Sequence, residues 1–437
     1  MSRLLLAAVV MAVTAAGSAS AASATRPLLT YALAPVVYDI GVNVGFGVCA
    51  TDLRGNPFRL SDPHLDHAPT WSRDGRTVAY VRGTPGGGYD VVATDARGRN
   101  LRILMHYEGN VQPSLGGWSR DSRRLAISTY GSAPGIYILN ADGTAGHAIL
   151  AAGYQAYLSA PSWSRDGRRL LFSIQGDPSG HPGGTYVVNP DGSNLRLLVN
   201  SAFGPSWSPD GRRFSYFAYA QPGPHGSQMA VWVARRDGTH HQIALPEAKG
   251  LSWSPNSRRL AYTNSQNELG VVAWNGTGPR VLAHEAASGP AWSPDGRLIA
   301  YVRDGTVLAT IRPDGTRERT VYTDGLPVEA PVWRPAMRLP SGRRPCMVHG
   351  TPRADVISGT NRGDLTDAGD GNDRIYGRGG EDLLIGGAGR DRVYGGPGDD
   401  VFLAQDGLRD VLYGGPGTDT AFVDPGVDRV TSIEVVH

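Results

Sequence analysis

PTWSRDGRTVAYV, residues 69–81, is the stretch that decides the fold. Its tryptophan, Trp71, precedes a polar Ser-Arg-Asp-Gly turn, and a short apolar run follows that turn. An Asp-Gly pair reverses the chain readily because both residues tolerate a positive φ. The stretch therefore predicts two short β-strands joined by a tight turn.

The same pattern returns along the chain at intervals of 39 to 47 residues. That spacing suits a propeller blade of four short strands. A second series of turns, including NPDG at 189–192 and RPDG at 312–315, alternates with the tryptophan turns and supplies the second hairpin of each blade. The further copies are WSRDSR (118–123), WSRDGR (163–168), WSPDGR (207–212), WSPNSR (253–258), WSPDGR (292–297) and a degenerate WRPAMR (333–338).

These turns predict an all-β fold containing a seven-bladed propeller, with a six-bladed propeller as the alternative. Six blades are complete in the sequence, and the seventh is split between the two ends of the repeat region. Its strands are expected from VVYDI (36–40) and the region around Cys49 on one side, and from APVW (330–333) on the other. Pairing the first and last strands closes the ring and removes the exposed edges of an open sheet.

In these residues the chain resembles the TolB-type (WD40-like) β-propeller repeat, whose hallmark is P-x-W-S-P-D-G before an apolar strand. The resemblance covers residues 36–337, and we expect the propeller domain at 28–337 and a linker at 338–349. The repeated tryptophans are expected to pack between blades and not to form a ligand cage.

From Gly350 onwards the sequence divides into units of nine, as in GGAGRDRVY (386–394) and GGPGDDVFL (395–403). The sixth residue of each unit is an aspartate and the eighth is usually apolar. One unit of ten, AQDGLRDVLY (404–413), keeps its aspartate. The series is Asp355, Asp364, Asp373, Asp382, Asp391, Asp400, Asp410, Asp419 and Asp428.

Glycine and aspartate in this order suit a calcium site. Glycine permits turns that direct backbone carbonyls inwards. Aspartate adds a hard carboxylate oxygen, and Ca²⁺ takes six to eight oxygen ligands. The last 88 residues hold 16 carboxylates and 8 arginines although the whole chain has a net charge of +2, which indicates cations as partners and argues against nucleic acid.

The units resemble the hemolysin-type (repeats-in-toxin) calcium-binding repeat, G-G-x-G-x-D-x-U-x. The resemblance implies a parallel β-roll over residues 350–431, in which two units make one coil and aspartates eighteen residues apart stack. It implies stacked pairs of Asp373 with Asp391, and of Asp382 with Asp400. The expected calcium ligands lie at Asp373, Asp382, Asp391, Asp400, Asp419, Gly369, Gly371, Gly387, Gly389, Gly396 and Gly398.

The first two units depart from the motif, with Arg353 and Arg362 where it has glycine. We expect residues 350–367 to form a cap with weak or no calcium sites. Convincing sites are confined to residues 368–419, where we expect roughly two to four ions.

The N-terminus reads as a secretory signal at residues 1–24. Arg3 supplies the positive charge, residues 4–16 an apolar stretch too short to span a bilayer, and Ala-Ser-Ala at 19–21 a cleavage site. The mature chain is therefore expected outside the cell with no transmembrane segment. In that setting Cys49 and Cys346 are expected to form a disulfide, with two buried thiols as the alternative.

The chain shows no catalytic constellation: G-x-S-x-G, H-E-x-x-H and the P-loop are all absent. Two histidine pairs, His64 with His67 and His240 with His241, are interpreted as surface residues. The sequence thus favours a secreted calcium-binding protein whose propeller is a non-catalytic platform for a protein or glycan. The alternative is an extracellular polysaccharide lyase or hydrolase that uses the propeller channel.

Overall fold

All regular structure in the computed structural model is β-strand, as the sequence predicts, for the part of the chain that it describes. Among the described residues, no helix is long and apolar enough to cross a membrane. The chain divides into two compact units, one of residues 1–32, 51–56 and 68–340 and the other of residues 33–50, 57–67 and 341–437. The described residues are 26–32, 36–37, 43–44, 48–52, 57–61, 66–84, 87–153, 156–177, 180–219, 229–236, 238–246, 248–286, 289–323, 328, 331–337 and 347–437.

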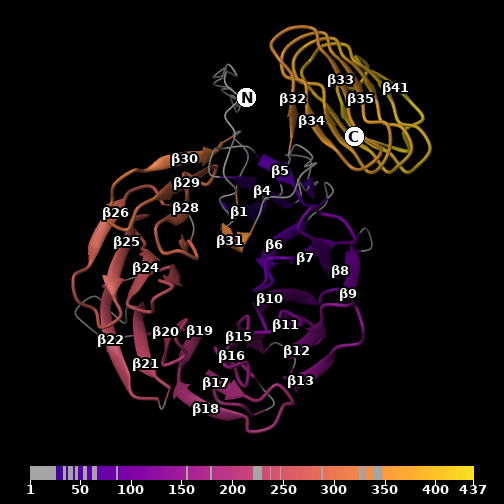
Figure 1. Cartoon of the computed structure of the whole chain (residues 1–437). Coiled ribbons are helices and arrows are strands. Elements are labelled where there is room, and N and C mark those ends of the chain that lie inside the picture. The colour runs from indigo at the N-terminus through magenta and orange to yellow at the C-terminus, as the bar shows by residue number, and fades with distance from the viewer. Residues whose placement is uncertain are drawn as a thin grey trace. The chain divides into compact units, whose positions relative to one another are not determined.

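Six sheets are each built from consecutive antiparallel strands, and Figure 1 shows them arranged around a ring. They are β6 (Asp66–Trp71), β7 (Thr77–Gly83), β8 (Tyr89–Asp95) and β9 (Arg102–Tyr107); β10 (Gln112–Trp118), β11 (Arg124–Tyr130), β12 (Gly135–Asn140) and β13 (His147–Ala151); β14 (Tyr157–Leu158), β15 (Ser162–Trp163), β16 (Leu170–Gln175), β17 (Gly184–Val188) and β18 (Arg196–Asn200); β19 (Ala202–Trp207), β20 (Arg213–Tyr219), β21 (Met229–Arg235) and β22 (His240–Pro246); β23 (Gly250–Trp253), β24 (Arg259–Thr263), β25 (Leu269–Ala273) and β26 (Arg280–Ala283); β27 (Ala291–Trp292), β28 (Ile299–Arg303), β29 (Val307–Ile311) and β30 (Arg319–Tyr322).

The tryptophan turn has the same shape in successive blades because of its serine and its aspartate. In the third blade the Ser164 hydroxyl donates to Asp166 Oδ1 at 2.6 Å, and the same oxygen accepts the Arg168 N–H at 3.1 Å. Ser164 Oγ in turn accepts the Arg169 N–H at 3.0 Å, and Gly167 takes a φ of 70°. Ser-x-Asp-Gly therefore satisfies the backbone of the turn with its own side chains.

The turn tryptophans pack between blades, as predicted. Trp163 lies in a buried cluster with Ile136 and Ile138 of the preceding blade and with Phe172 of its own blade. Trp118, Trp207, Trp253 and Trp292 each join a cluster that also draws on the preceding blade. Each large ring thus contributes apolar burial to two blades at once.

One further sheet draws its strands from both ends of the propeller region, in the order β31-β1-β4-β5. Strand β31 pairs antiparallel with β1, with Trp333 opposite Leu29. The propeller therefore has six blades made of consecutive strands, as the six-bladed alternative predicts, and the main prediction of seven blades is corrected. Of the strands expected in a split seventh blade, those around Cys49 and APVW contribute instead to this composite four-stranded sheet. The strands are β1 (Arg26–Ala32), β4 (Val48–Asp52), β5 (Pro57–Arg59) and β31 (Val332–Met337).

The predicted contribution of VVYDI to this sheet was wrong. Its first two residues form β2 (Val36–Val37), which pairs with β3 (Asn43–Val44) in a separate two-stranded sheet. The rest of VVYDI lies outside the described residues. The seven residues of β1 match the six of β31 in length, whereas β2 has only two, so the longer strand forms the closing ladder.

Cys49 is fully buried and disulfide-bonded. The sequence contains one other cysteine, Cys346, which lies outside the described residues.

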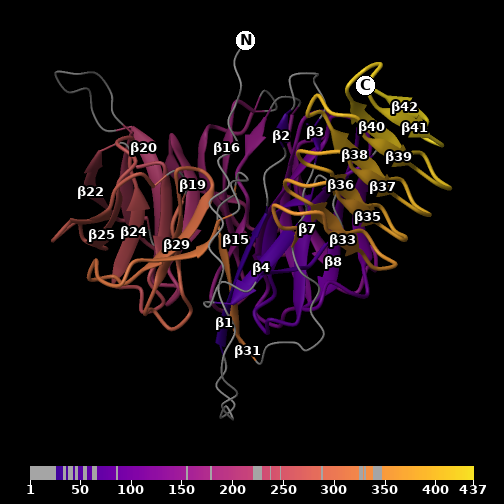
Figure 2. The same ribbon diagram turned by 90° about the horizontal axis from the view of Figure 1, so that it is seen from above.

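The repeat region forms two parallel sheets whose coils stack one on another (Figure 2). Pairing joins residues eighteen apart, as Ile375 with Val393, and becomes nineteen across the ten-residue unit, as Val393 with Leu412. The first sheet comprises β32 (Val348–His349), β34 (Leu365–Asp367), β36 (Leu383–Ile385), β38 (Val401–Ala404), β40 (Thr420–Val423) and β42 (Val435–Val436); the second comprises β33 (Val356–Ser358), β35 (Arg374–Tyr376), β37 (Arg392–Tyr394), β39 (Val411–Tyr413) and β41 (Arg429–Thr431).

The apolar eighth residues of the units fill the interior of the roll, as the pattern predicts. Ile375, Leu384, Val393 and Phe402 are among the members of one buried cluster. Val430 is the exception at 36% exposure, because it lies in the last strand of its sheet. This core is one residue wide between the two sheets, so burial of apolar area alone contributes little to its stability.

Candidate metal centre

The aspartates of the roll stand in two columns, one at the start of each sheet's strands. Each aspartate's Oδ1 accepts the backbone N–H of the aspartate one coil earlier, as Asp391 does from Asp373 at 2.7 Å and Asp400 from Asp382 at 2.8 Å. The stacking implied by the family resemblance is therefore present. The ten-residue unit does not break it, since Asp419 accepts from Asp400 at 2.8 Å.

The second carboxylate oxygen of the central aspartates has no hydrogen-bond partner. These Oδ2 atoms are buried, and a buried carboxylate oxygen left unpaired is costly. A bound cation removes that cost. The aspartates concerned are Asp373, Asp391, Asp400, Asp410 and Asp419.

The aspartates at the ends of the series are satisfied by the protein itself. Asp355 Oδ2 accepts from the backbone N–H of Thr351 at 2.6 Å and from its hydroxyl at 2.8 Å. Thr360 does the same for Asp364 at the same two distances. Asp428 Oδ2 accepts the Asp424 N–H at 2.8 Å. The end aspartates therefore have protein donors for Oδ2, and the Oδ2 atoms without a hydrogen-bond partner lie in the coils between them. That the first two units form a cap with weak or no calcium sites stays a prediction.

In most units that begin with glycine, that glycine leaves room beside the Oδ2 atom of the unit's aspartate. The units of Asp373 and Asp410 begin instead with Ala368 and Ala404. A Cβ on Gly377 would lie 2.2 Å from Asp382 Oδ2, and one on Gly395 would lie 2.2 Å from Asp400 Oδ2. Neither glycine was among the predicted ligand positions. Their motif position, directly after the preceding strand, is the signal that identifies them.

The six predicted glycines lie in the turns with positive φ, at the second and fourth positions of their units. A Cβ on Gly389 would lie 1.4 Å from the Gly371 carbonyl oxygen, and one on Gly398 would lie 2.1 Å from that of Gly380. Carbonyl oxygens of one coil therefore point at the turn of the next. They are hard oxygen donors of the kind that Ca²⁺ binds.

Burial raises the pKa of Asp391 to about 6, and those of Asp400 and Asp410 to about 7. It also raises the pKa of Asp373 and of Asp419. Backbone N–H groups oppose the effect, whereas neighbouring carboxylates add to it. A column of partly protonated, mutually repelling carboxylates is a site at which a divalent cation replaces protons.

Asp410 is the ligand candidate that the predicted set lacked. Its unpaired Oδ2 and raised pKa match those of Asp400, and it donates its N–H to Asp428. The aspartate of the ten-residue unit was visible in the sequence, but its register was not. Stacking of Asp391 on Asp410 across nineteen residues supplies that register.

Side chains alone do not complete a metal site in the described residues, since no three His, Cys, Asp or Glu groups gather there. A calcium ion in the roll therefore needs the turn carbonyls as well as the aspartates. Of the histidine pairs, His67 lies on β6 and His240 and His241 begin β22, while His64 is outside the described part.

Two family models match the chain. The model described as the TolB beta propeller domain matches residues 89–337, more than half of the chain. The model for the RTX calcium-binding nonapeptide repeat, of four copies, matches residues 349–384, 367–402 and 409–430. The roll therefore consists of calcium-binding nonapeptide repeats. No curated protein matches the chain.

Several solved structures share the propeller fold at low identity. An oligogalacturonate lyase in complex with manganese is 14% identical over 65% of this chain and 91% of its own, with a TM-score of 0.51. The tricorn protease is 13% identical over 72% of this chain but only 36% of its own, with a TM-score of 0.50. TolB from Acinetobacter baumannii is 18% identical over 60% and 67%, with a TM-score of 0.46. Identities this low indicate a shared fold alone.

Acid should stabilise the metal-free roll. The pKa of Asp400 and Asp410 is about 7 in the folded chain and near 3.9 in an unfolded one, so folding favours their protonated forms. This contribution is fully present below about pH 4 and is lost as the pH rises through about 7. In chelator, thermal unfolding of the roll followed by circular dichroism should occur at a lower temperature at pH 8 than at pH 5. An equal or higher temperature at pH 8 would contradict the assignment.

Gly395→Ala should weaken calcium binding, because its Cβ would overlap the Asp400 carboxylate. Displacing a ligand's surroundings typically lowers metal affinity by about tenfold or more. Gly379→Ala is the matched control in the roll, since its nearest contact would be an ordinary 3.5 Å. Calcium titration calorimetry on both variants measures the difference. Equal calcium affinities of the two variants would show that the absence of a Cβ at Gly395 is not needed for calcium binding.

Proposed function

Because the chain belongs to the TolB β-propeller family and ends in calcium-binding nonapeptide repeats, we propose that it is a secreted, calcium-stabilised binding protein. Calcium completes the roll, and the propeller is a non-catalytic platform for an extracellular protein or polysaccharide. The observation that carries the calcium part is the set of five buried Oδ2 atoms without a hydrogen-bond partner, those of Asp373, Asp391, Asp400, Asp410 and Asp419.

Calcium would supply positive charge to the central aspartates of both columns. Asp382, Asp400 and Asp419 belong to one column, and Asp373, Asp391 and Asp410 to the other. Metal ligation requires these carboxylates to be ionised, so calcium binding releases the protons that burial retains. Because the apolar core of the roll is thin, the free energy of calcium binding would make a large contribution to the folding stability of the roll.

Exposed aromatic side chains support a platform role for the propeller. Tyr130 is 47% exposed, Tyr157 57% and Tyr219 65%. The rings of Tyr130 and Tyr157 lie 5.8 Å apart, and Tyr157 lines a cavity of about 340 Å³ together with Phe203. Exposed, clustered tyrosines are typical of recognition surfaces, because each offers an apolar ring and a polar hydroxyl.

The disulfide at Cys49 supports export, because disulfides persist mainly in oxidising compartments. The proposed signal at residues 1–24 lies outside the described part of the chain.

The lyase or hydrolase alternative lacks a single centre in the described propeller. Its two 2.6 Å His–Asp contacts, Asp90 with His106 and Asp177 with His181, lie in the first and third blades. Catalysis by a carboxylate and a histidine needs both groups within reach of one substrate bond. The geometry therefore favours binding over catalysis.

Asp400→Asn should lower calcium uptake by the full-length chain. The change keeps the shape of the side chain but removes the charge, which is expected to weaken the affected site by at least about tenfold. Without calcium, the same change should stabilise the roll, because it removes a repelling carboxylate. Titration calorimetry and thermal unfolding measure the two effects.

Asp355→Asn is the matched control, because Thr351 already satisfies that carboxylate. It should leave calcium uptake unchanged. A wild-type chain that takes up no calcium, or an Asp400 variant that takes up as much as the wild type, would contradict the proposal.

A further inference from the structure

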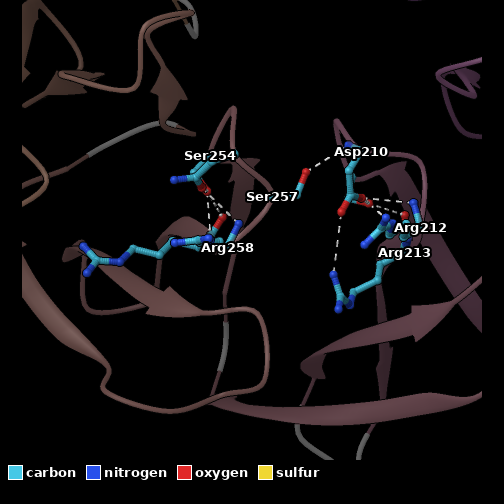
Figure 3. Close-up of polar contacts among 9 residues, drawn as sticks. Asp210, Arg212, Arg213, Ser254, Ser257 and Arg258 are labelled. Carbon is cyan, nitrogen blue, oxygen red and sulfur yellow. Dashed lines mark hydrogen bonds and ion pairs between the residues drawn. The ribbon is translucent and has the colours of Figure 1, made fainter.

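The tryptophan turns of neighbouring blades touch one another and form a continuous turn ring. The Asp74 N–H donates to Ser122 Oγ at 3.0 Å, and the Asp210 N–H donates to Ser257 Oγ at 2.9 Å (Figure 3). A Cβ on Gly211 would lie 3.1 Å from the Cβ of Arg165 in the preceding blade. We define the turn ring as residues 72–77, 119–124, 164–169, 208–213, 254–259 and 293–298.

The turn ring is strongly cationic. It holds thirteen arginines and five aspartates, although the chain as a whole has a net charge of only +2. The aspartates are used within their own turns, as when Asp121 accepts from the Ser119 hydroxyl at 2.5 Å and from the Arg123 N–H at 3.1 Å. Their charge reduces that of the ring, but the arginines remain in excess.

Three of these arginines have no role in the turn itself. Arg73, Arg120 and Arg165 occupy the third position of the motif in the first three blades, where the next three have proline. The turn forms equally well with either residue. The serine-to-aspartate hydrogen bond is 2.6 Å beside Arg165 and 2.7 Å beside Pro209.

The three arginines lie close enough to interact. Partial burial, together with the charges of Arg120 and Arg165, lowers the pKa of Arg73. Arg120 and Arg165 line a cavity of about 290 Å³ with Arg236, which makes a 3.7 Å ion pair with Asp166. Within the described part of the chain, no hydrogen bond or ion pair engages the three guanidinium groups.

We propose that the cluster of Arg73, Arg120 and Arg165 binds the carboxylates of an acidic polysaccharide. The inference rests on the proposed platform role and names its ligand. A guanidinium group matches a carboxylate with two parallel hydrogen bonds. Arginines repeated from blade to blade suit a ligand that repeats its charge, because successive contacts reinforce one another.

A nucleic acid fits the same surface less well. Proteins that bind single strands stack bases on exposed aromatic rings. The aromatic residues of these turns are buried instead, with Trp118 3% and Trp163 4% exposed. The turn ring therefore offers charge without a stacking surface.

The test uses the full-length chain with saturating calcium, and hyaluronan as a carboxylated probe. Dextran is the neutral probe and duplex DNA the nucleic-acid probe, each measured by biolayer interferometry at low and high salt. The main variant is Arg120→Pro with Arg165→Pro, which the turns of the fourth to sixth blades already accommodate. Pro209→Arg is the converse change, and Arg196→Ala removes an exposed charge from β18, outside the turn ring.

The wild type should bind hyaluronan, bind dextran much more weakly, and lose affinity in high salt as screening increases. The double proline variant should bind hyaluronan at least about tenfold more weakly, with unchanged thermal unfolding and calcium uptake. Pro209→Arg should bind more tightly, and Arg196→Ala should match the wild type.

Undiminished hyaluronan binding by the double variant, or DNA binding as tight as hyaluronan binding, would overturn the inference. Binding of dextran and hyaluronan with equal, arginine-independent affinity would overturn it too, but would leave the platform proposal intact. Shortening of the hyaluronan chains by the wild type would instead overturn the non-catalytic platform. Even in that case, weaker hyaluronan binding by the double proline variant would support the arginine cluster as the contact site.

Discussion

The roll depends on the electrostatics of five buried carboxylate oxygens that have no hydrogen-bond partner in the protein. Two features of the roll position these oxygens. Glycines remove the Cβ atoms that would displace them, and stacked N–H groups hold the opposite oxygen of each carboxylate. Because the apolar core is thin and the carboxylates repel one another, we propose that a bound cation stabilises the folded roll. In the first two units, Thr351 and Thr360 donate hydrogen bonds to the corresponding oxygens of Asp355 and Asp364, so these carboxylates do not need a cation.

Aspartate has the opposite role in the propeller. In the turn of the third blade, a hydrogen bond from the Ser164 hydroxyl lowers the pKa of Asp166. In the roll, burial raises the pKa of Asp400 to about 7. The first carboxylate is satisfied by its own turn and stabilises it without a metal. The same residue type therefore has a lowered pKa in a self-satisfied propeller turn and a raised pKa in the roll, and the local hydrogen-bond donors and burial account for the difference.

Much of this organisation was predictable, because both repeats carry their chemistry locally. Ser-x-Asp-Gly closes its own turn, and an aspartate in every unit of the roll indicates the stacking. The features that escaped prediction depend on distant partners. Strand β1 is recognisable only from its pairing with β31, and the register of Asp410, which the sequence does reveal as an aspartate of the series, only from its stacking with Asp391. The arginines of the turn ring were visible in the motif, but their proximity depends on how the first three blades pack side by side.

The central claim is that calcium stabilises the folded roll and leaves the propeller's own stability unchanged. Hydrogen exchange of the full-length chain, measured by mass spectrometry with calcium and with chelator, tests it most directly. Peptides from residues 368–419 should exchange fast in chelator and become protected in calcium, while peptides from the six complete blades exchange alike in both. Equal protection of residues 368–419 in the two conditions would contradict the account.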